Sequence, residues 1–289
     1  MTATGKGRRI GIIGAGTMGK CVTADLLFHQ VPCVLVDISE QKLLEAKAEI
    51  ERVLRFAGSI SKELPKVNVA EAMEQVRFTT DIREAADCSY IIENVPEKWE
   101  LKEDVYKQLD GICGDEVCYA ANTSCLSITK IAGATKRPKQ VVGVHFMNPS
   151  YLKSTVEVIK GFYTSESCVE ETVEVLNELN KTAIIVHDFP GFVSNRISHL
   201  FMNEAAFVVQ DGVADAAQVD QIFKKCYGHR MGPLETADLI GLDTVVHSLH
   251  VLYESYQDPK FRCCPLLRKM VDAGLLGRKT GRGFYKYGS

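Results

Sequence analysis

The chain has 289 residues, of which 46% are apolar and 25% charged, and its formal net charge is −3. This length and composition are typical of a globular protein with two domains, and they exclude a membrane-spanning protein because no apolar run is long enough. A slightly negative charge without a basic cluster argues against nucleic acid as a partner. The N-terminal sequence lacks the apolar segment of a secretory signal, so we expect a cytoplasmic protein.

The first informative segment, residues 8–37, predicts a βαβ unit. A β-branched run at 8–14 is followed by an amphipathic helical pattern at 17–29 and a second apolar run at 31–37. Between the first strand and the helix, Gly14, Gly16 and Gly19 have the G-x-G-x-x-G spacing. These glycines permit a tight turn, close approach of a pyrophosphate and close packing of helix on strand, while the helix N-terminal amides face the phosphates.

Asp37 ends the second strand of this unit. A carboxylate at that place accepts hydrogen bonds from an adenosine ribose and repels a 2′-phosphate, and the following Ile38 and Ser39 offer no cation for such a phosphate. We therefore expect NAD rather than NADP as the cofactor. The alternative is a packing turn that binds no nucleotide.

The alternation of strands and helices continues along the chain. A helix is predicted at 39–56 and strands at 76–80, 90–95, 117–123, 140–146, 154–161 and 182–188, with helical patterns between most of them. The predicted fold class is α/β, with an N-terminal Rossmann-type, doubly wound, mostly parallel sheet whose ligands bind at the carboxyl ends of the strands. Those ends carry Glu93, Asn94, residues 122–124 and His145.

The pattern changes after Pro190-Gly191, a dipeptide whose composition is typical of a hinge. Helices are predicted at 192–211, 215–227, 235–256 and 265–273, with one further strand at the C-terminal GFYKY. We expect an NAD-binding Rossmann domain at 1–188 and a smaller all-helical domain for substrate binding and dimerisation at 189–289. The apolar faces of its helices exceed what a small domain needs, which favours a homodimer through the C-terminal domain.

The ten cysteines include no CxxC pair, so free thiols are expected rather than disulfides or a zinc site. His247, His250 and Glu254 could share one helical face at a spacing that metal ligands use. Because no fourth ligand is near them in the sequence, we interpret them as a polar helix face and expect no metal.

Eight segments, in order, resemble the 3-hydroxyacyl-CoA dehydrogenase family, including its 3-hydroxybutyryl-CoA type: GIIGAGTMG, ENVPEKWELKEDVYKQLD, AANTSCLSI, GVHFMNP, VEVIKG, DFPGFVSNRI, MGPLETADLIGLDTV and GRKTGRGFYKY. The resemblance covers nearly the whole chain. It implies NAD-dependent oxidation or reduction of the 3-hydroxyl of a short acyl thioester, by residues of the Rossmann domain and the helical domain.

Oxidation of a secondary alcohol needs a base for the hydroxyl proton, and the imidazole of His145 suits this task near neutral pH. The resemblance implies that Glu157 holds the other ring nitrogen of this histidine. It also assigns Ser124 and Asn195 to hydrogen bonds with the substrate oxygen and the histidine. Taken singly, a strand-end histidine or a strand glutamate more often has a structural role.

The cofactor-binding residues predicted from the motif and the resemblance lie in the glycine-rich turn, at the strand ends and near the C-terminus. For Lys279 and Asn148, the alternative interpretation is a purely structural role. The full set is Gly14, Gly16, Thr17, Met18, Gly19, Asp37, Glu97, Lys102, Asn122, Asn148 and Lys279.

Two segments depart from the family pattern. After Asn148-Pro149, where many members are apolar, this chain has the more polar SYLKST, and in segment 52–66 the positions closest to the serine and lysine of CoA-using relatives are Val53 and Ile60. The acyl thioester could therefore be carried by CoA or by an acyl carrier protein, as in the glyceryl-acyl-carrier-protein dehydrogenases of polyketide extender-unit pathways, which this chain also resembles. The residues are also compatible with a non-catalytic, crystallin-like NAD-binding protein and with a free hydroxyacid dehydrogenase, in which Arg196 would bind a carboxylate.

Overall fold

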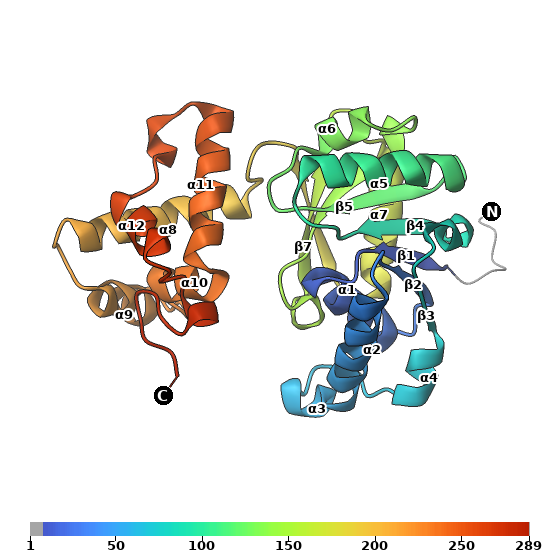
Figure 1. Cartoon of the computed structure of the whole chain (residues 1–289), viewed down its shortest axis with the longest axis horizontal. Helices are drawn as coiled ribbons and strands as arrows, with labels where there is room; N and C mark the ends of the chain where they lie inside the picture. Colours follow the sequence, from blue (N-terminus) through green and yellow to red (C-terminus); the bar gives the residue numbers. More distant parts are fainter. Residues whose placement is uncertain (1–7, 289) are drawn as a thin grey trace. The chain divides into compact units, whose positions relative to one another are not determined.

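The computed structural model describes residues 8–288, and it divides into two compact units. The first unit ends at Asp188 and the second begins at Phe189. Each has its own apolar core, which in the first unit includes Ile12 and Val158 and in the second Leu234 and Leu249. Figure 1 shows the sheet in the first unit and the helices of the second.

Within the described residues, eight strands of the first unit form one sheet in the order β3-β2-β1-β4-β5-β6-β7-β8. Strands β1 to β6 are parallel, β7 is antiparallel to β6, and β8 is parallel to β7. The predicted doubly wound, mostly parallel sheet is confirmed. The strands are β1 (Ile10–Ile13), β2 (Cys33–Val36), β3 (Val76–Thr79), β4 (Tyr90–Glu93), β5 (Cys118–Asn122), β6 (Val141–His145), β7 (Thr155–Lys160) and β8 (Thr182–His187).

The reversal of direction at β7 was not predicted. Its cause is the short connection, residues 146–154, which holds only the 3-10 turn η3 (Ser150–Leu152). A parallel neighbour would need a crossover of a dozen or more residues, whereas an antiparallel neighbour can follow a short turn. As a result the end of β6 lies beside β7, and the two strands share a register that brings their side chains together.

Helices cover both faces of the sheet (Figure 1). Alternate strand residues such as Val144 and Val158 belong to the core cluster with α1, α2 and α7. On the other face Tyr119 packs against Tyr106 of α5. The helices are α1 (Thr17–Phe28), α2 (Glu40–Arg55), α3 (Ala57–Ile60), α4 (Val69–Glu74), α5 (Trp99–Ile112), α6 (Ile128–Gly133) and α7 (Glu166–Glu178), with the 3-10 turns η1 (Ile82–Asp87) and η2 (Pro138–Gln140).

The second unit is built from helices, as predicted, but its middle differs from the prediction. The single helix expected at 235–256 is two helices, because Gly241 adopts φ +105°, a conformation that glycine reaches readily and other residues rarely do. The C-terminal GFYKY is not a strand; isolated bridges join Gly277 to Arg282 and Arg282 to Lys286. The helices are α8 (Ser194–Gln210), α9 (Ala216–Cys226), α10 (Pro233–Ile240), α11 (Leu242–Tyr256) and α12 (Pro265–Asp272), with the 3-10 turns η4 (Pro259–Phe261) and η5 (Arg278–Thr280).

Among the helices of residues 8–288, none is both long and apolar enough to cross a bilayer. All ten cysteines are free thiols.

Candidate active site

His145 and Glu157 form the centre of the candidate site. They are register partners on β6 and β7, and partners across an antiparallel pair point to the same face of a sheet. The distance from His145 Nδ1 to Glu157 Oε2 is 2.9 Å, and the two residues are 6% and 9% exposed. An ionised carboxylate only accepts, so Nδ1 carries the proton and Nε2 of the neutral ring is an acceptor.

Ser124 lies on the other side of the ring, in the loop that follows β5. Its Oγ is 3.2 Å from His145 Nε2, so it lies within hydrogen-bond distance of the nitrogen that a general base would use. The structure thus brings Ser124, His145 and Glu157 together in one row. Asn195 is the second residue of α8 in the second unit, where its carbonyl accepts a hydrogen bond from His199 Nδ1 at 3.0 Å.

Glu97 holds the loop that carries Ser124. Its Oε1 accepts hydrogen bonds from the Ser124 amide at 2.9 Å, the Cys125 amide at 3.1 Å and the hydroxyl of Thr123. Burial raises the pKa of Glu97, but the charge of Lys102 and these hydrogen bonds outweigh it, so the pKa is lowered overall. Glu97 is therefore held ionised against the backbone of the loop that carries Ser124.

Lys102 is fully buried behind Glu97. Its Nζ lies 2.9 and 2.8 Å from the two carboxylate oxygens of Glu93, 3.1 Å from the Asn122 carbonyl and 3.7 Å from Glu97. Burial raises the pKa of Glu93, and the neighbouring Lys102 opposes that rise. The contacts of Lys102 and Glu97 in this structure are thus to the backbone and carboxylates around the Ser124 loop.

Glu93 was identified as a strand-end residue but not as a site residue. The sequence did contain a signal for it, since Glu93 ends the strand YIIE and a carboxylate on a buried strand needs a cation as its partner. That cation is Lys102, nine positions further along the chain.

The glycine-rich turn has the shape that a dinucleotide needs. Gly14 has φ +100°, and a Cβ on Gly19 would lie 1.8 Å from the Gly14 carbonyl oxygen. A Cβ on Gly16 would meet nothing within 4 Å, so this glycine leaves open space next to the start of α1. The residues present therefore fit a pyrophosphate at the helix N-terminus. Thr17 there is exposed, and Met18 packs partly against the core.

Asp37 is fixed at the end of β2 by two backbone amides. Its Oδ2 accepts from Ala15 at 2.9 Å and its Oδ1 from Ser39 at 3.0 Å. The neighbouring Ile38 side chain is 96% exposed. The carboxylate is thus rigidly placed beside the glycine-rich turn, with an apolar residue where an NADP-binding protein would place a cation.

Three further predicted residues have identifiable contacts. Asn122 donates from Nδ2 to Asn94 Oδ1 at 2.7 Å and accepts from the Phe146 amide at 3.3 Å, so it joins the ends of β5 and β6. Asn148 Oδ1 accepts from the thiol of Cys21 at 3.5 Å. Lys279 lies in the second unit, where its Nζ is 2.5 Å from Asp243 Oδ1.

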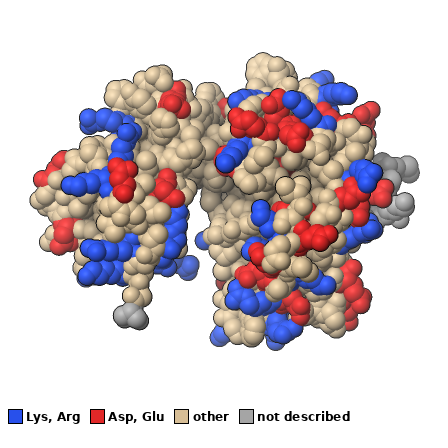
Figure 2. All heavy atoms as spheres, viewed as in Figure 1, with Lys and Arg blue, Asp and Glu red and all other residues tan. Residues whose placement is uncertain are grey.

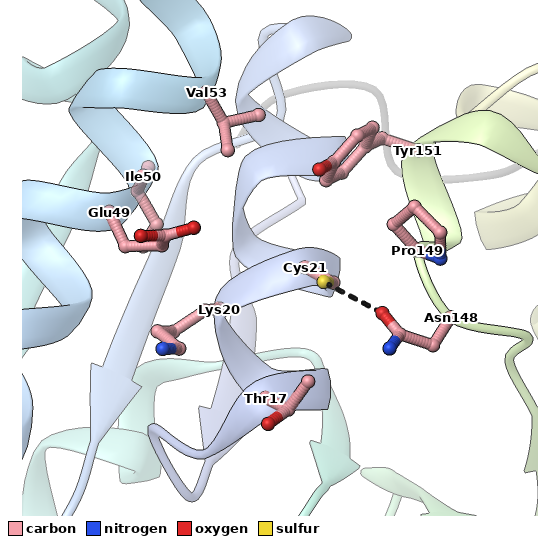
Figure 3. Close-up of a pocket in the computed structure, with 9 residues that line it drawn as sticks. All are labelled: Thr17, Lys20, Cys21, Glu49, Ile50, Val53, Asn148, Pro149 and Tyr151. Carbon is pink, nitrogen blue, oxygen red and sulfur yellow. Dashed lines mark hydrogen bonds between the residues drawn. The ribbon is translucent and has the colours of Figure 1, made fainter. Parts of the chain in front are cut away.

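A cavity of about 300 Å³ opens beside Asn148, between α1, α2 and η3. Figure 3 shows Tyr151 of η3 and Val53 of α2 on either side of it, with Cys21 of α1 next to Asn148. Tyr151 belongs to the polar segment SYLKST, which departs from the family pattern. Cys21 was missed, since nothing in its sequence neighbourhood distinguishes it from a helix-core residue. The lining residues are Thr17, Lys20, Cys21, Glu49, Ile50, Val53, Asn148, Pro149 and Tyr151.

Within residues 8–288, no group of three or more His, Cys, Asp or Glu side chains is arranged to hold a metal ion. His250 and Glu254 form an exposed ion pair at 3.2 Å on α11.

Two family models match the chain in sequence. The model described as 3-hydroxyacyl-CoA dehydrogenase, NAD binding domain, matches residues 9–189, and the C-terminal domain model of the same name matches residues 191–287. Together they account for nearly all of the described residues.

Named relatives align along the full length. The chain is 42% identical over 283 residues to a probable 3-hydroxybutyryl-CoA dehydrogenase of Deinococcus radiodurans, covering 96% of this chain and 100% of the relative. It is 38% identical to the 3-hydroxybutyryl-CoA dehydrogenase of Bradyrhizobium diazoefficiens, covering 97% and 95% of the two chains. The crystal structure of (S)-3-hydroxybutyryl-CoA dehydrogenase from Ralstonia eutropha is similar with a TM-score of 0.92 and 38% identity, covering 98% of this chain and 100% of that one.

Proposed function

The chain belongs to the 3-hydroxyacyl-CoA dehydrogenase family, and from that premise we propose that His145 is the general base of an NAD-dependent oxidation of a short 3-hydroxyacyl thioester. The protein is an NAD-dependent oxidoreductase of this family, so the alternative of a non-catalytic NAD-binding protein is set aside. The observation that carries the proposed role is the alignment of Glu157, His145 and Ser124, with 2.9 and 3.2 Å between successive groups.

In this proposal Nε2 of His145 takes the proton of the substrate hydroxyl. Glu157 holds the ring in the tautomer that makes Nε2 an acceptor, and it stabilises the imidazolium that forms. Ser124 donates to the substrate oxygen, and Glu97 fixes the loop that places this hydroxyl. Asn195 binds the same oxygen, as the resemblance implies. NAD, when bound, accepts the hydride that leaves the substrate carbon.

The proposed substrate is 3-hydroxybutyryl-CoA, because the relatives that match the whole chain are named as dehydrogenases of that compound. The test is the appearance of NADH when purified protein receives NAD and a series of 3-hydroxyacyl-CoA thioesters. We expect the highest kcat/KM with short acyl chains. Activity confined to free hydroxyacids would contradict the proposal and would favour the alternative role of Arg196 as a carboxylate-binding residue; Arg196 lies 4.6 Å from the ring of Tyr256.

An acyl carrier protein is the second candidate for the group that carries the acyl chain. Two basic residues of segment 52–66, Arg52 and Arg55, pair with Glu49 and Glu51 of their own helix, which weakens that segment as a basic surface. Figure 2 shows a gathering of Lys and Arg on the second unit around its C-terminal end, and the exposed basic residues of that segment are Arg278, Lys279, Arg282 and Lys286. Such a surface suits the acidic helix of a carrier protein.

Comparing kcat/KM for 3-hydroxybutyryl-CoA with that for the same acyl group on a carrier protein, at low and high salt, separates the two carriers. A carrier protein that docks on basic residues should lose efficiency steeply with added salt. Efficient turnover of the CoA thioester, with none of the carrier thioester, would exclude the second candidate.

We further propose a homodimer through the second unit and a cytoplasmic location. The helices of this unit were expected to carry more apolar residues than their own core needs. Leu242 and Val245 are fully buried in that core, whereas Leu239 is 51% exposed. Ile197 and Ile222 are also at least half exposed in the single chain. Exposed apolar residues of this kind favour contact with a second copy of the chain. The free thiols are typical of proteins in a reducing compartment, which favours the cytoplasm. Sedimentation equilibrium measures the oligomeric state.

A further inference from the structure

A buried ion pair of the first unit joins α1 to the residue that precedes β8. Asp25 of α1 and Lys181, which precedes β8, are 2.9 Å apart between Oδ2 and Nζ, and their side chains are 1% and 4% exposed. Removing two charges from water is costly unless each charge has well-placed partners. Burial raises the pKa of Asp25, while Lys181 opposes that rise. A pair of this kind, remote in sequence from His145, calls for a physical role.

Lys181 uses its other hydrogen-bond donors on the backbone of the segment after Asn148-Pro149. Its Nζ donates to the Ser150 carbonyl at 2.9 Å and to the Lys153 carbonyl at 2.7 Å. The same ammonium group that pairs with the Asp25 carboxylate thus donates to two carbonyls, one in the first residue of η3 and one just after its last. One buried cation thus ties both ends of η3 to α1.

The turn held in this way carries Tyr151. The Tyr151 ring packs edge-on against Phe28 of α1, with 6.1 Å between ring centroids, and it forms one wall of the cavity, opposite Val53 of α2 (Figure 3). Because η3 is held at both ends, its backbone, and with it the point from which the Tyr151 side chain projects, is fixed by the contacts of Lys181. The place of Tyr151 in the cavity wall therefore depends on the ion pair.

We propose that Tyr151 determines which acyl chains this enzyme accepts and that the Asp25–Lys181 pair is the positioning device that holds Tyr151 in place. This inference rests on the proposed function. The cavity adjoins Asn148, three residues after His145, and its lining mixes Thr17, Lys20 and Glu49 with apolar side chains. A fixed tyrosine in this wall favours a short or hydroxylated chain over a long aliphatic one.

The first test is a chain-length profile of kcat/KM for 3-hydroxybutyryl-CoA and 3-hydroxyoctanoyl-CoA. Tyr151→Ala should shift the ratio of the two efficiencies toward the longer chain by about tenfold or more, since a few methylenes in a fitted pocket have effects of that size. Lys181→Met should shift the ratio in the same direction, because it releases η3 while Tyr151 is still present.

The matched control is Asp110→Asn, which breaks another nearly buried ion pair of the same unit, with Arg137 at 2.8 Å and side chains 5% and 8% exposed. Its midpoint of thermal unfolding should fall, as in Lys181→Met, but the efficiency ratio should stay at the wild-type value. An equal shift in the control would mean that the ratio reports only lost stability, and the inference would be wrong.

The second test needs no turnover. Cys21 lines the same cavity as Tyr151 and is partly buried, and burial raises its pKa, so alkylation by N-ethylmaleimide should be slow in the wild type. Lys181→Met and Tyr151→Ala should each accelerate alkylation of Cys21 by about tenfold or more relative to the exposed Cys226, followed by peptide mass spectrometry.

The two tests separate this inference from the proposed function. Faster Cys21 alkylation without wild-type turnover of any 3-hydroxyacyl thioester would keep the positioning role and overturn the function. Wild-type turnover with an unchanged ratio and an unchanged Cys21 rate in both variants would overturn the inference alone.

Discussion

His145 and Glu157 are direct partners in the register of β6 and β7, and their side chains meet with 2.9 Å between Nδ1 and Oε2. The contact is built by the backbone, because a shift of one residue in this register would turn Glu157 to the opposite face of the sheet. The short connection that reverses the chain is therefore also what orients the proposed base.

Glu157→Gln should lower kcat by about 10²-fold or more, because an amide can still accept from Nδ1 but no longer balances the charge of an imidazolium. Combined with His145→Gln, its effect should be less than additive, since the two side chains act as a unit. Steady-state kinetics of the two single variants and the double variant measure this. Fully additive losses would show that Glu157 acts independently of His145.

Cofactor preference should follow from Asp37. The fixed carboxylate repels a 2′-phosphate, so kcat/KM with NAD should exceed that with NADP by at least about tenfold, the effect of ~1.4 kcal/mol. Replacing Asp37 by serine together with Ile38 by arginine should narrow this gap. Equal efficiencies of the wild type with both cofactors would contradict the role of Asp37.

The glycine-rich turn offers a matched pair of variants. Gly16→Ala places its Cβ in open space, so the midpoint of thermal unfolding should stay near the wild-type value while NAD affinity falls by about tenfold or more, because the methyl group occupies the approach of the pyrophosphate. Gly19→Ala should lower both the midpoint of thermal unfolding and the NAD affinity, since its Cβ would lie 1.8 Å from the Gly14 carbonyl oxygen. Titration of NAD by calorimetry, with thermal melts, distinguishes them. Wild-type affinity in Gly16→Ala would place the pyrophosphate elsewhere.

Much of the fold could be predicted because its signals are local. Strand and helix periodicity, the glycine spacing and Asp37 are each carried by neighbouring residues, and all eight strands of the sheet occur where they were expected. The break at Gly241 was missed since the helical pattern of 235–256 continues through that glycine, and only its φ of +105° reveals the boundary.

The buried charges were the least predictable part of the candidate site. Lys102 was predicted to lie on the cofactor side, and its contacts with Glu93 and the Asn122 carbonyl were not predicted. The pairing of Asp25 with Lys181 joins residues distant in the sequence, and no periodic pattern relates such partners. Distant contacts of this kind depend on how the helices pack on the sheet, which a single sequence specifies only through the complete fold.

Stability against acid should depend on Glu97. Its pKa is lowered from the ordinary value of 4.5 because the folded protein favours the ionised form. The stability it contributes is therefore complete above about pH 4.5 and is lost as the pH falls through the lowered value. The difference in unfolding free energy between wild type and Glu97→Gln should shrink as the pH decreases from about 6 to about 3 in urea titrations.

Glu100→Gln, an exposed position in the first turn of α5 and three residues after Glu97, is the control for this prediction. It should show little dependence on pH relative to the wild type. A difference for Glu97→Gln that grows toward acid pH would mean that the carboxylate is not held ionised by its loop.

The most direct measurement is the rate of NADH formation from NAD and 3-hydroxybutyryl-CoA by the wild type and by His145→Gln, with NAD affinity determined in parallel. The account predicts that the wild type turns over, that kcat of the variant falls by roughly 10²–10⁴, the usual effect of a lost general base, and that NAD binds both proteins equally. Near wild-type turnover by His145→Gln would contradict it.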